Sequence, residues 1–102
     1  MEKVQLENLI RGFLNAEGKL TSYPTKRKKK NAALLWLSFC FEEGKIYTEK
    51  EVNEILNNAC AFKDPALLRR ELYNLRFLER TRDCSEYHKS SPLPTDEELG
   101  IL

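Results

Sequence analysis

The segment Thr48–Leu56, with the sequence TEKEVNEIL, follows the short run Lys45–Tyr47 without a break. Thr48 and Glu51 form the S/T-x-x-E pattern of a capping box, in which each side chain accepts a hydrogen bond from a backbone N–H group of the first helical turn. The run before it is long enough only for a short strand. This stretch therefore predicts a strand that leads directly into a capped amphipathic helix.

A second helix is predicted to follow closely. Asp64 is a good N-cap and Pro65 suits the first helical position. Since the segment AFKD between the two helices is short and ends in this cap, the pair reads as a helix-turn-helix unit. Two strands are then predicted in FLERTRD and EYHKS, joined by a tight turn near residues 83–85. The helix that starts at Asp64-Pro65 is the fourth along the chain, and its inward stripe consists of Leu68, Leu72 and Leu75.

Two more helices are predicted on the N-terminal side. Residues 3–15 place apolar side chains at steps of three and four, which indicates a helix with one apolar stripe. Residues 26–43 form the next predicted helix, with Thr25 as its N-cap and Gly44 at its end. Its second half, AALLWLSFCFEE, is apolar almost all round, as expected of a central helix. Cys40 is therefore predicted to lie in the core.

This order of elements is that of a winged helix-turn-helix with an extra N-terminal helix. The class is mainly α with a small antiparallel sheet, because the short strand should pair with the hairpin, which is marginal alone. The expected organisation is an N-terminal helix at 1–19, a winged-helix domain at 20–90 and an acidic, proline-containing tail at 91–102. Thr95 could cap a short turn there, but we expect the tail to be mobile or loosely docked.

Length and composition limit the class of protein. A chain of 102 residues suits one domain. Hydrophobic residues make up 41% and charged residues 32%, a balance typical of globular proteins rather than of disordered or membrane proteins. No apolar stretch reaches about 18 residues, and the start, MEKVQLENLI, lacks the features of a signal peptide. We therefore expect a cytoplasmic protein without a membrane partner.

No catalytic, cofactor or metal site is predicted. The three cysteines are an odd number and lie far apart in the sequence, so we expect reduced thiols rather than disulfides. Cys84 and His88 are one loose pair, whereas a zinc site needs two pairs at defined spacing. The chain has no glycine-rich phosphate loop, and His88 has no evident nucleophile beside it. An enzyme is therefore not expected.

The charges are unevenly distributed along the chain. The net charge is only +1, but residues 25–41 hold five basic residues and no acid. Residues 42–63 hold three basic and five acidic residues, and residues 91–102 hold three acids and no base. A near-neutral protein with one concentrated basic run can still present a local phosphate-binding surface.

Three stretches of the sequence resemble a known family: YPTKRKKKNAALLWLSFCFEEGKIYTEKEVNEIL, LLRRELYNLRFLER and EYHKS. The most specific part is Y-T-E-x-E-V-N, supported by L-R-R-x-L. Together they are similar to a prokaryotic domain of unknown function that occurs alone or attached to small helix-turn-helix transcriptional regulators. The resemblance covers about residues 20–90. It implies a winged-helix-like, regulatory domain, and it implies neither a ligand nor a reaction.

Three groups of side chains predict a nucleic-acid-binding surface. The basic run at the start of the helix predicted for residues 26–43 would hold phosphates. Arginines and a tyrosine of the fourth helix, which starts at Asp64-Pro65, would read base edges. The wing would contact the DNA backbone. Two alternatives stay open: the basic run could serve solubility alone, and Arg69 or Arg70 could pair with acids of the third helix. The predicted contacts are Lys26, Arg27, Lys28, Lys29, Lys30, Arg69, Arg70, Tyr73, Arg76, Arg80, Arg82 and Lys89.

The function predicted from these patterns is a DNA-binding transcriptional regulator, with a homodimer or a partner regulator domain as further partners. The alternative is a protein-interaction module that has the same fold without DNA binding. A ligand sensor with a pocket lined by Trp36 and phenylalanines is a third reading. The first two differ in one feature: DNA binding is favoured if the basic run shares one side of the molecule with the fourth helix and the wing.

Overall fold

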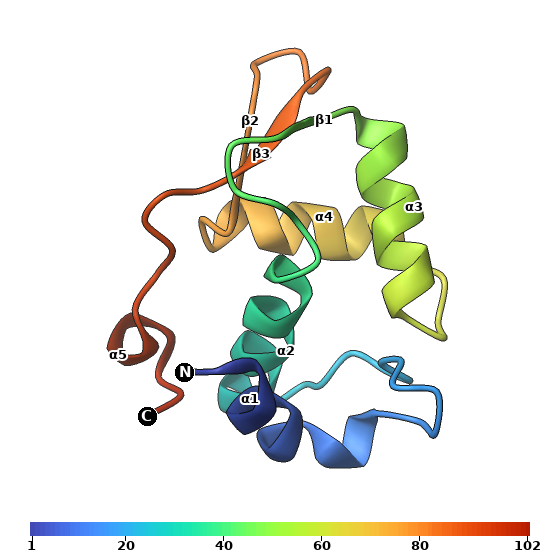
Figure 1. Cartoon of the computed structure of the whole chain (residues 1–102), viewed down its shortest axis with the longest axis vertical. Coiled ribbons are helices and arrows are strands. Elements are labelled where there is room, and N and C mark those ends of the chain that lie inside the picture. The colour runs from blue at the N-terminus through green and yellow to red at the C-terminus, as the bar shows by residue number, and fades with distance from the viewer.

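The computed structural model describes all 102 residues, and it confirms a mainly helical fold with a small antiparallel sheet in a winged-helix arrangement with an extra N-terminal helix (Figure 1). No helix combines the length and apolar character that crossing a membrane requires. The elements are α1 (Lys3–Leu9), a 3-10 turn (Arg11–Phe13), α2 (Arg27–Ser38), β1 (Ile46–Tyr47), α3 (Glu49–Ala59), α4 (Pro65–Asn74), β2 (Leu78–Arg80), β3 (Tyr87–Lys89) and α5 (Asp96–Leu99).

The short strand β1 closes the sheet, as predicted. The strand order is β1-β3-β2 and both pairings are antiparallel. Tyr47 of β1 lies opposite Tyr87 of β3, and both tyrosines are buried in the core. The hairpin, which comprises β2, β3 and the turn between them, therefore gains a third strand and an apolar inner face. The sheet lies at one end of the molecule, and α5 and both termini lie toward the other (Figure 1).

The helix-turn-helix pair begins at the predicted caps. The Thr48 hydroxyl accepts a hydrogen bond from the Glu51 N–H at 3.1 Å, and the Glu51 carboxylate accepts one from the Thr48 N–H at 2.8 Å. This second bond lowers the pKa of Glu51 below its ordinary value. Asp64 caps α4 by accepting from the Leu67 N–H at 3.3 Å, with Pro65 at the first helical position. Both helix starts are therefore fixed by local sequence.

Helix α2 forms the centre of the core but is shorter than predicted. Every residue from Asn31 to Ser38 is buried. Lys26 rather than Thr25 occupies the N-cap position, and no side chain caps the helix there. The prediction that the first helix reaches residue 15 is also wrong, because α1 ends at Leu9 and a 3-10 turn follows.

The early end of α2 has a tertiary cause. After Ser38 the chain turns so that the Phe41 ring meets the Tyr47 ring edge to face, with centroids 5.3 Å apart. The same turn brings the Glu42 N–H within 2.8 Å of the Tyr47 hydroxyl. The predicted core position of Cys40 is wrong for the same reason, since Cys40 lies in this turn and is exposed.

The tail is docked in the main core, whereas a mobile or loosely docked segment was expected. Leu99 and Ile101 are 3% and 1% exposed and belong to the main core. The buried Asn31 side chain of α2 donates a hydrogen bond to the Leu99 carbonyl at 2.9 Å. Thr95 caps α5 with a complete capping box. The tail therefore covers one side of α2, which explains why that helix is apolar almost all round.

The backbone conformation of Arg76 is expected to lower the free energy of unfolding. Arg76 follows α4 with φ 65°, in the left-handed region that disfavours residues with a Cβ. Its N–H donates to the Tyr73 carbonyl and the Phe77 N–H donates to the Leu72 carbonyl, which is the helix ending that favours glycine. Arg76→Gly should raise the free energy of unfolding by about 0.5–1 kcal/mol, measured by urea denaturation.

A matched control for this prediction lies in the same helix. Arg70 is an exposed residue inside α4, where glycine should cost about 1 kcal/mol. The two arginine-to-glycine changes should therefore shift the urea midpoint in opposite directions. A midpoint that falls for both variants would contradict the argument from backbone geometry.

Candidate nucleic-acid interface

Helix α4 presents a buried side and an exposed side. Leu68 and Leu72 are 1% and 0% exposed, and they anchor the helix in the core. Arg70, Tyr73 and Asn74 are exposed. These three follow one another at steps of three and one, so they share the outer side of the helix. The side opposite the core is thus the one available to a partner.

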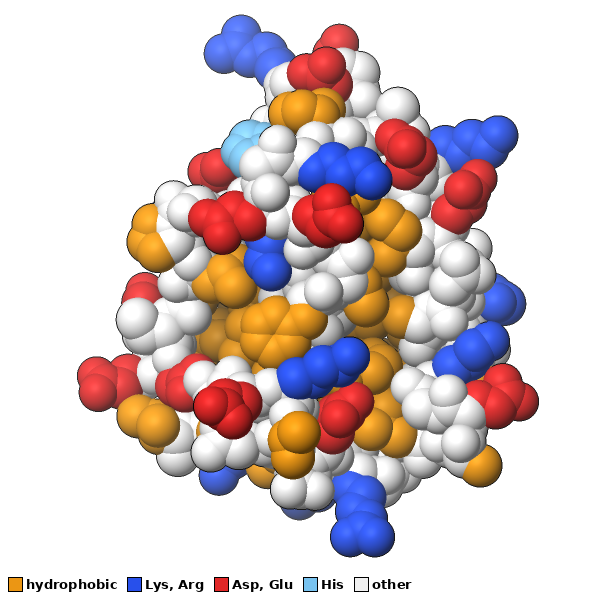
Figure 2. Space-filling view, in the orientation of Figure 1, with side chains coloured by type: hydrophobic (Ala, Val, Ile, Leu, Met, Phe, Trp, Pro, Cys, Tyr) orange, Lys and Arg blue, Asp and Glu red, His pale blue; other side chains and the backbone are white.

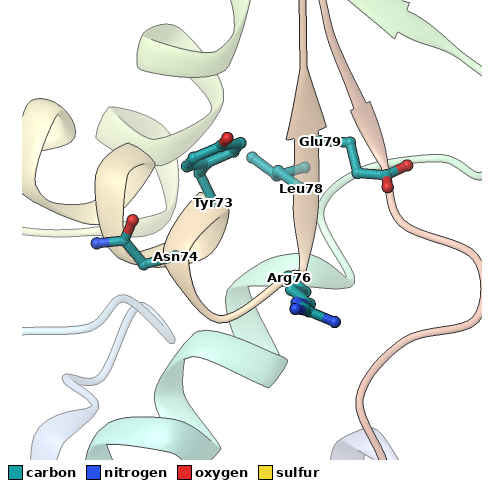
Figure 3. Close-up of a pocket in the computed structure, with 5 residues that line it drawn as sticks. All are labelled: Tyr73, Asn74, Arg76, Leu78 and Glu79. Atoms are coloured by element: carbon teal, nitrogen blue, oxygen red, sulfur yellow. The ribbon is translucent and has the colours of Figure 1, made fainter.

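The hairpin adds an arginine to this side. Leu78 and Arg80 are two residues apart on β2 and therefore project from the same face of the strand. Leu78 packs into the core, and Figure 3 shows its side chain and that of Tyr73 pointing toward one another. The Arg80 guanidinium lies over the Tyr73 ring, 4.0 Å from its centroid. This cation–π contact holds the guanidinium beside the exposed side of α4.

A shallow cavity of about 380 Å³ lies beside Tyr73, at the junction of α4 and β2. In Figure 3 the Arg76 side chain comes from the turn between the two elements and points away from Tyr73, toward the segment that leads to α5. Sequence reasoning missed the other lining residues, because their neighbourhood depends on how β2 returns past the end of α4. These residues are Asn74, Leu78 and Glu79.

Arg69 does not belong to this exposed side. Its guanidinium forms an ion pair with Glu49 of α3, with Nη2 and Oε1 2.7 Å apart, and it also donates a hydrogen bond to the side-chain oxygen of Asn53. The Arg69 side chain is only 18% exposed. Arg69, which was predicted to contact nucleic acid, is therefore turned toward α3, and the alternative pairing with an acid of that helix is confirmed.

The remaining arginines of this region form no ion pair. The ion pairs of the structure involve the N-terminus, Lys19 and Arg69, and a fourth close contact joins His88 to Glu79. Two acids of the hairpin have partners of their own: Glu79 contacts His88 at 2.8 Å, and Ser85 and Thr81 donate to Asp83, which lowers the pKa of Asp83. The carboxylate of Glu86, in the turn of the hairpin, is exposed and forms no ion pair. We call the exposed set Arg70, Tyr73, Arg80 and Arg82 the arginine face. Arg76, which was predicted to join it, points toward the segment that leads to α5 and lines a separate cavity with Glu98.

The predicted basic run lies elsewhere. Lys26–Lys30 surround the start of α2, which lies at the end of the molecule away from the hairpin (Figure 1). None of these five residues forms an ion pair. Figure 2 shows basic and acidic side chains interspersed over the face in view, with apolar surface between them. The structure thus has two separate basic regions and does not join them into the single surface that was expected.

Lys89 is placed apart from both regions. Its Nζ lies 5.4 Å from the centre of the Phe39 ring, in the turn that follows α2. Phe39 is 36% exposed, so the lysine partly covers an apolar side chain. Lys89 therefore belongs to the β3 side of the sheet rather than to the exposed side of α4.

The cysteines and Trp36, which were considered as parts of a metal site or a ligand pocket, can also be located in the structure. The three cysteines are free thiols, and no group of three His, Cys, Asp or Glu residues is placed to hold a metal ion. Trp36 is buried and its ring N–H donates to the Glu7 carboxylate at 3.1 Å. It lines none of the cavities, so it serves the core and not a ligand pocket.

Comparison with known proteins gives one match. A model of a family described as "Uncharacterized protein conserved in bacteria (DUF2087)" matches residues 19–89. No curated protein and no solved structure matches the chain. The matched range contains α2, the helix-turn-helix pair and the hairpin, and it agrees with the range over which the sequence resembles a prokaryotic domain of unknown function. Because the match spans more than half of the 102 residues, the chain belongs to this bacterial family.

Proposed function

We propose that the arginine face binds duplex DNA and that the chain is a non-enzymatic module of a transcriptional regulator. In helix-turn-helix proteins the second helix of the pair enters the major groove. That helix is α4 here, and its outer side carries Arg70 and Tyr73. Guanidinium groups at such positions donate two hydrogen bonds to a guanine edge or to a phosphate.

The observation that carries the proposal is the stack of Arg80 on Tyr73, on a face that also carries Arg70 and Arg82, neither of which forms an ion pair. An arginine held against a ring has less side-chain freedom to lose when it binds, so its N–H groups are ready for a planar acceptor. Arg82 lies in the turn of the hairpin, where a wing contacts the DNA backbone. The arrangement thus supplies both a base-reading helix and phosphate contacts.

A protein-interaction module remains the second candidate, and two observations favour it. The basic run does not share a side with α4 and the hairpin, so the arrangement that favours DNA binding is only partly present. Ile46, on the edge strand β1, is 55% exposed. An edge strand has unpaired backbone groups and can add a strand from another chain. The resemblance to domains attached to regulators supports a partner regulator domain, or a second copy, on that edge.

The test is a fluorescence-anisotropy titration with random-sequence duplex DNA at about 50 and 200 mM salt. The protein should bind at low salt and weaken steeply as salt rises. The double variant Arg70→Gln/Arg80→Gln should lose at least about tenfold in affinity, and the slope of log affinity against log salt should fall by about two, one for each lost contact.

The matched control is Lys28→Gln/Lys30→Gln, which removes the same charge from the other end of the molecule. It should change affinity by less than about threefold, because phosphate contacts act at short range when salt screens the charges. The proposal fails if the protein does not bind DNA at low salt, or if both double variants weaken binding equally.

A further inference from the structure

A second cavity lies at the start of α2, at the opposite end of the molecule from the hairpin. Its volume is about 350 Å³, which falls within the range of small-molecule pockets. The 3-10 turn supplies one wall and the segment that leads into α2 supplies the other. The lining residues are Phe13, Ser22, Tyr23, Pro24, Thr25, Lys26 and Lys29.

The charged side chains of this cavity are both basic. Lys26 and Lys29 line it, and neither forms an ion pair. No acidic residue is among the lining residues. Because α2 starts without a side-chain cap, the N–H groups of its first turn add to the same positive field. Ser22 and Thr25 add two aliphatic hydroxyl groups to the lining. The cavity is therefore suited to an anion.

Two aromatic rings complete the walls. The Lys29 ammonium lies 5.8 Å from the centre of the Phe13 ring. Tyr23 donates its hydroxyl proton to the Glu71 carboxylate of α4, at 3.4 Å. Burial, followed by the charge of Glu71, raises the pKa of this hydroxyl, so it stays protonated. Since the Tyr23 hydroxyl is held by Glu71, the part of Tyr23 that remains for a ligand is its ring.

We propose that this cavity binds a nucleotide, with the phosphate at Lys26 and Lys29 and the planar base against the rings of Phe13 and Tyr23. Ammonium groups and hydroxyls bind phosphate oxygens, and bases stack on aromatic side chains. A ligand with only one of these parts would use half of the site. The proposal concerns a different region from the arginine face, and it does not depend on duplex DNA binding there.

The experiment is a titration of the ¹⁵N-labelled full chain followed by NMR, with adenosine 5′-monophosphate, inorganic phosphate and adenosine as three separate probes. The monophosphate should saturate with shift changes at Ser22, Lys26 and Lys29, and each of the other two should bind at least about tenfold more weakly. A short single-stranded oligonucleotide forms a fourth arm. If the oligonucleotide bound more tightly than the monophosphate at the same residues, the nucleotide would be part of a single-stranded nucleic acid rather than a free mononucleotide.

A matched pair of variants separates a built site from general attraction. Lys26→Gln/Lys29→Gln removes two charges that line the cavity, and Lys28→Gln/Lys30→Gln removes two charges of the same run that do not. The first should weaken the monophosphate at least about tenfold and the second less than about threefold. Equal losses in both variants would overturn the proposal, as would the absence of saturable binding or equal affinity for phosphate alone.

Discussion

Replacing Leu99 with alanine should lower the free energy of unfolding by about 2–5 kcal/mol, the usual cost of removing a large aliphatic side chain from a core. Leu99 is 3% exposed and packs with the main core although it is the fourth residue from the end of the sequence. The substitution leaves a cavity beside α2. It also loosens the segment whose carbonyl accepts the hydrogen bond from the buried Asn31 side chain.

Urea denaturation followed by circular dichroism measures this effect, and the tail supplies its own control. Leu102 is 74% exposed, so Leu102→Ala should change stability by less than about 0.5 kcal/mol. Similar urea midpoints for the two variants would mean that the tail does not dock. Leu99→Met, which conserves volume, should cost less than about 1.5 kcal/mol and shows whether the packing itself matters.

Replacing Tyr47 with alanine should cost about 3–5 kcal/mol, as expected of a buried aromatic ring. Tyr47 is 3% exposed, and its ring meets the Phe41 ring edge to face. Its hydroxyl accepts a hydrogen bond from the Glu42 N–H at 2.8 Å. The ring therefore links the turn after α2 to β1, and its loss should weaken the sheet and the start of α3 together.

Two further variants divide this effect into its parts. Tyr47→Phe keeps the ring and removes only the hydrogen bond, so it should cost about 1 kcal/mol. Ile46→Ala lies on the same strand, where Ile46 is 55% exposed, and it should cost less than about 1 kcal/mol. Thermal or urea unfolding compares the three. If Tyr47→Phe were as damaging as Tyr47→Ala, the hydroxyl rather than the ring would hold this junction.

The local elements could be predicted from the sequence because their causes lie within a few residues. The Thr48–Glu51 capping box and the Asp64–Pro65 start specify α3 and α4 through hydrogen bonds and backbone angles of adjacent residues. The alternation of the hairpin places Leu78 and Tyr87 inside. Since a short strand and a hairpin are stable only together, the three-stranded sheet followed from the same elements.

The candidate site was predicted only in part, because side-chain partners come from other elements. Arg69 and Arg70 are neighbours in the sequence, yet Arg69 faces Glu49 of α3 and Arg70 faces solvent. The stack of Arg80 on Tyr73 depends on how β2 passes the end of α4. Periodicity places residues on a side of a helix, but it does not tell which helix lies opposite.

The sequence by itself determined the kind, the order and the capped starts of the helices that form the helix-turn-helix pair, because hydrogen bonds and steric preferences between near neighbours decide these features. Only the tertiary structure decided where α2 ends, that the tail docks, and that the lysines at the start of α2 lie away from the arginine face. These outcomes depend on contacts between segments tens of residues apart, such as those of Phe41 with Tyr47 and of Asn31 with Leu99, and the geometry of such contacts is set by the packing of the whole core.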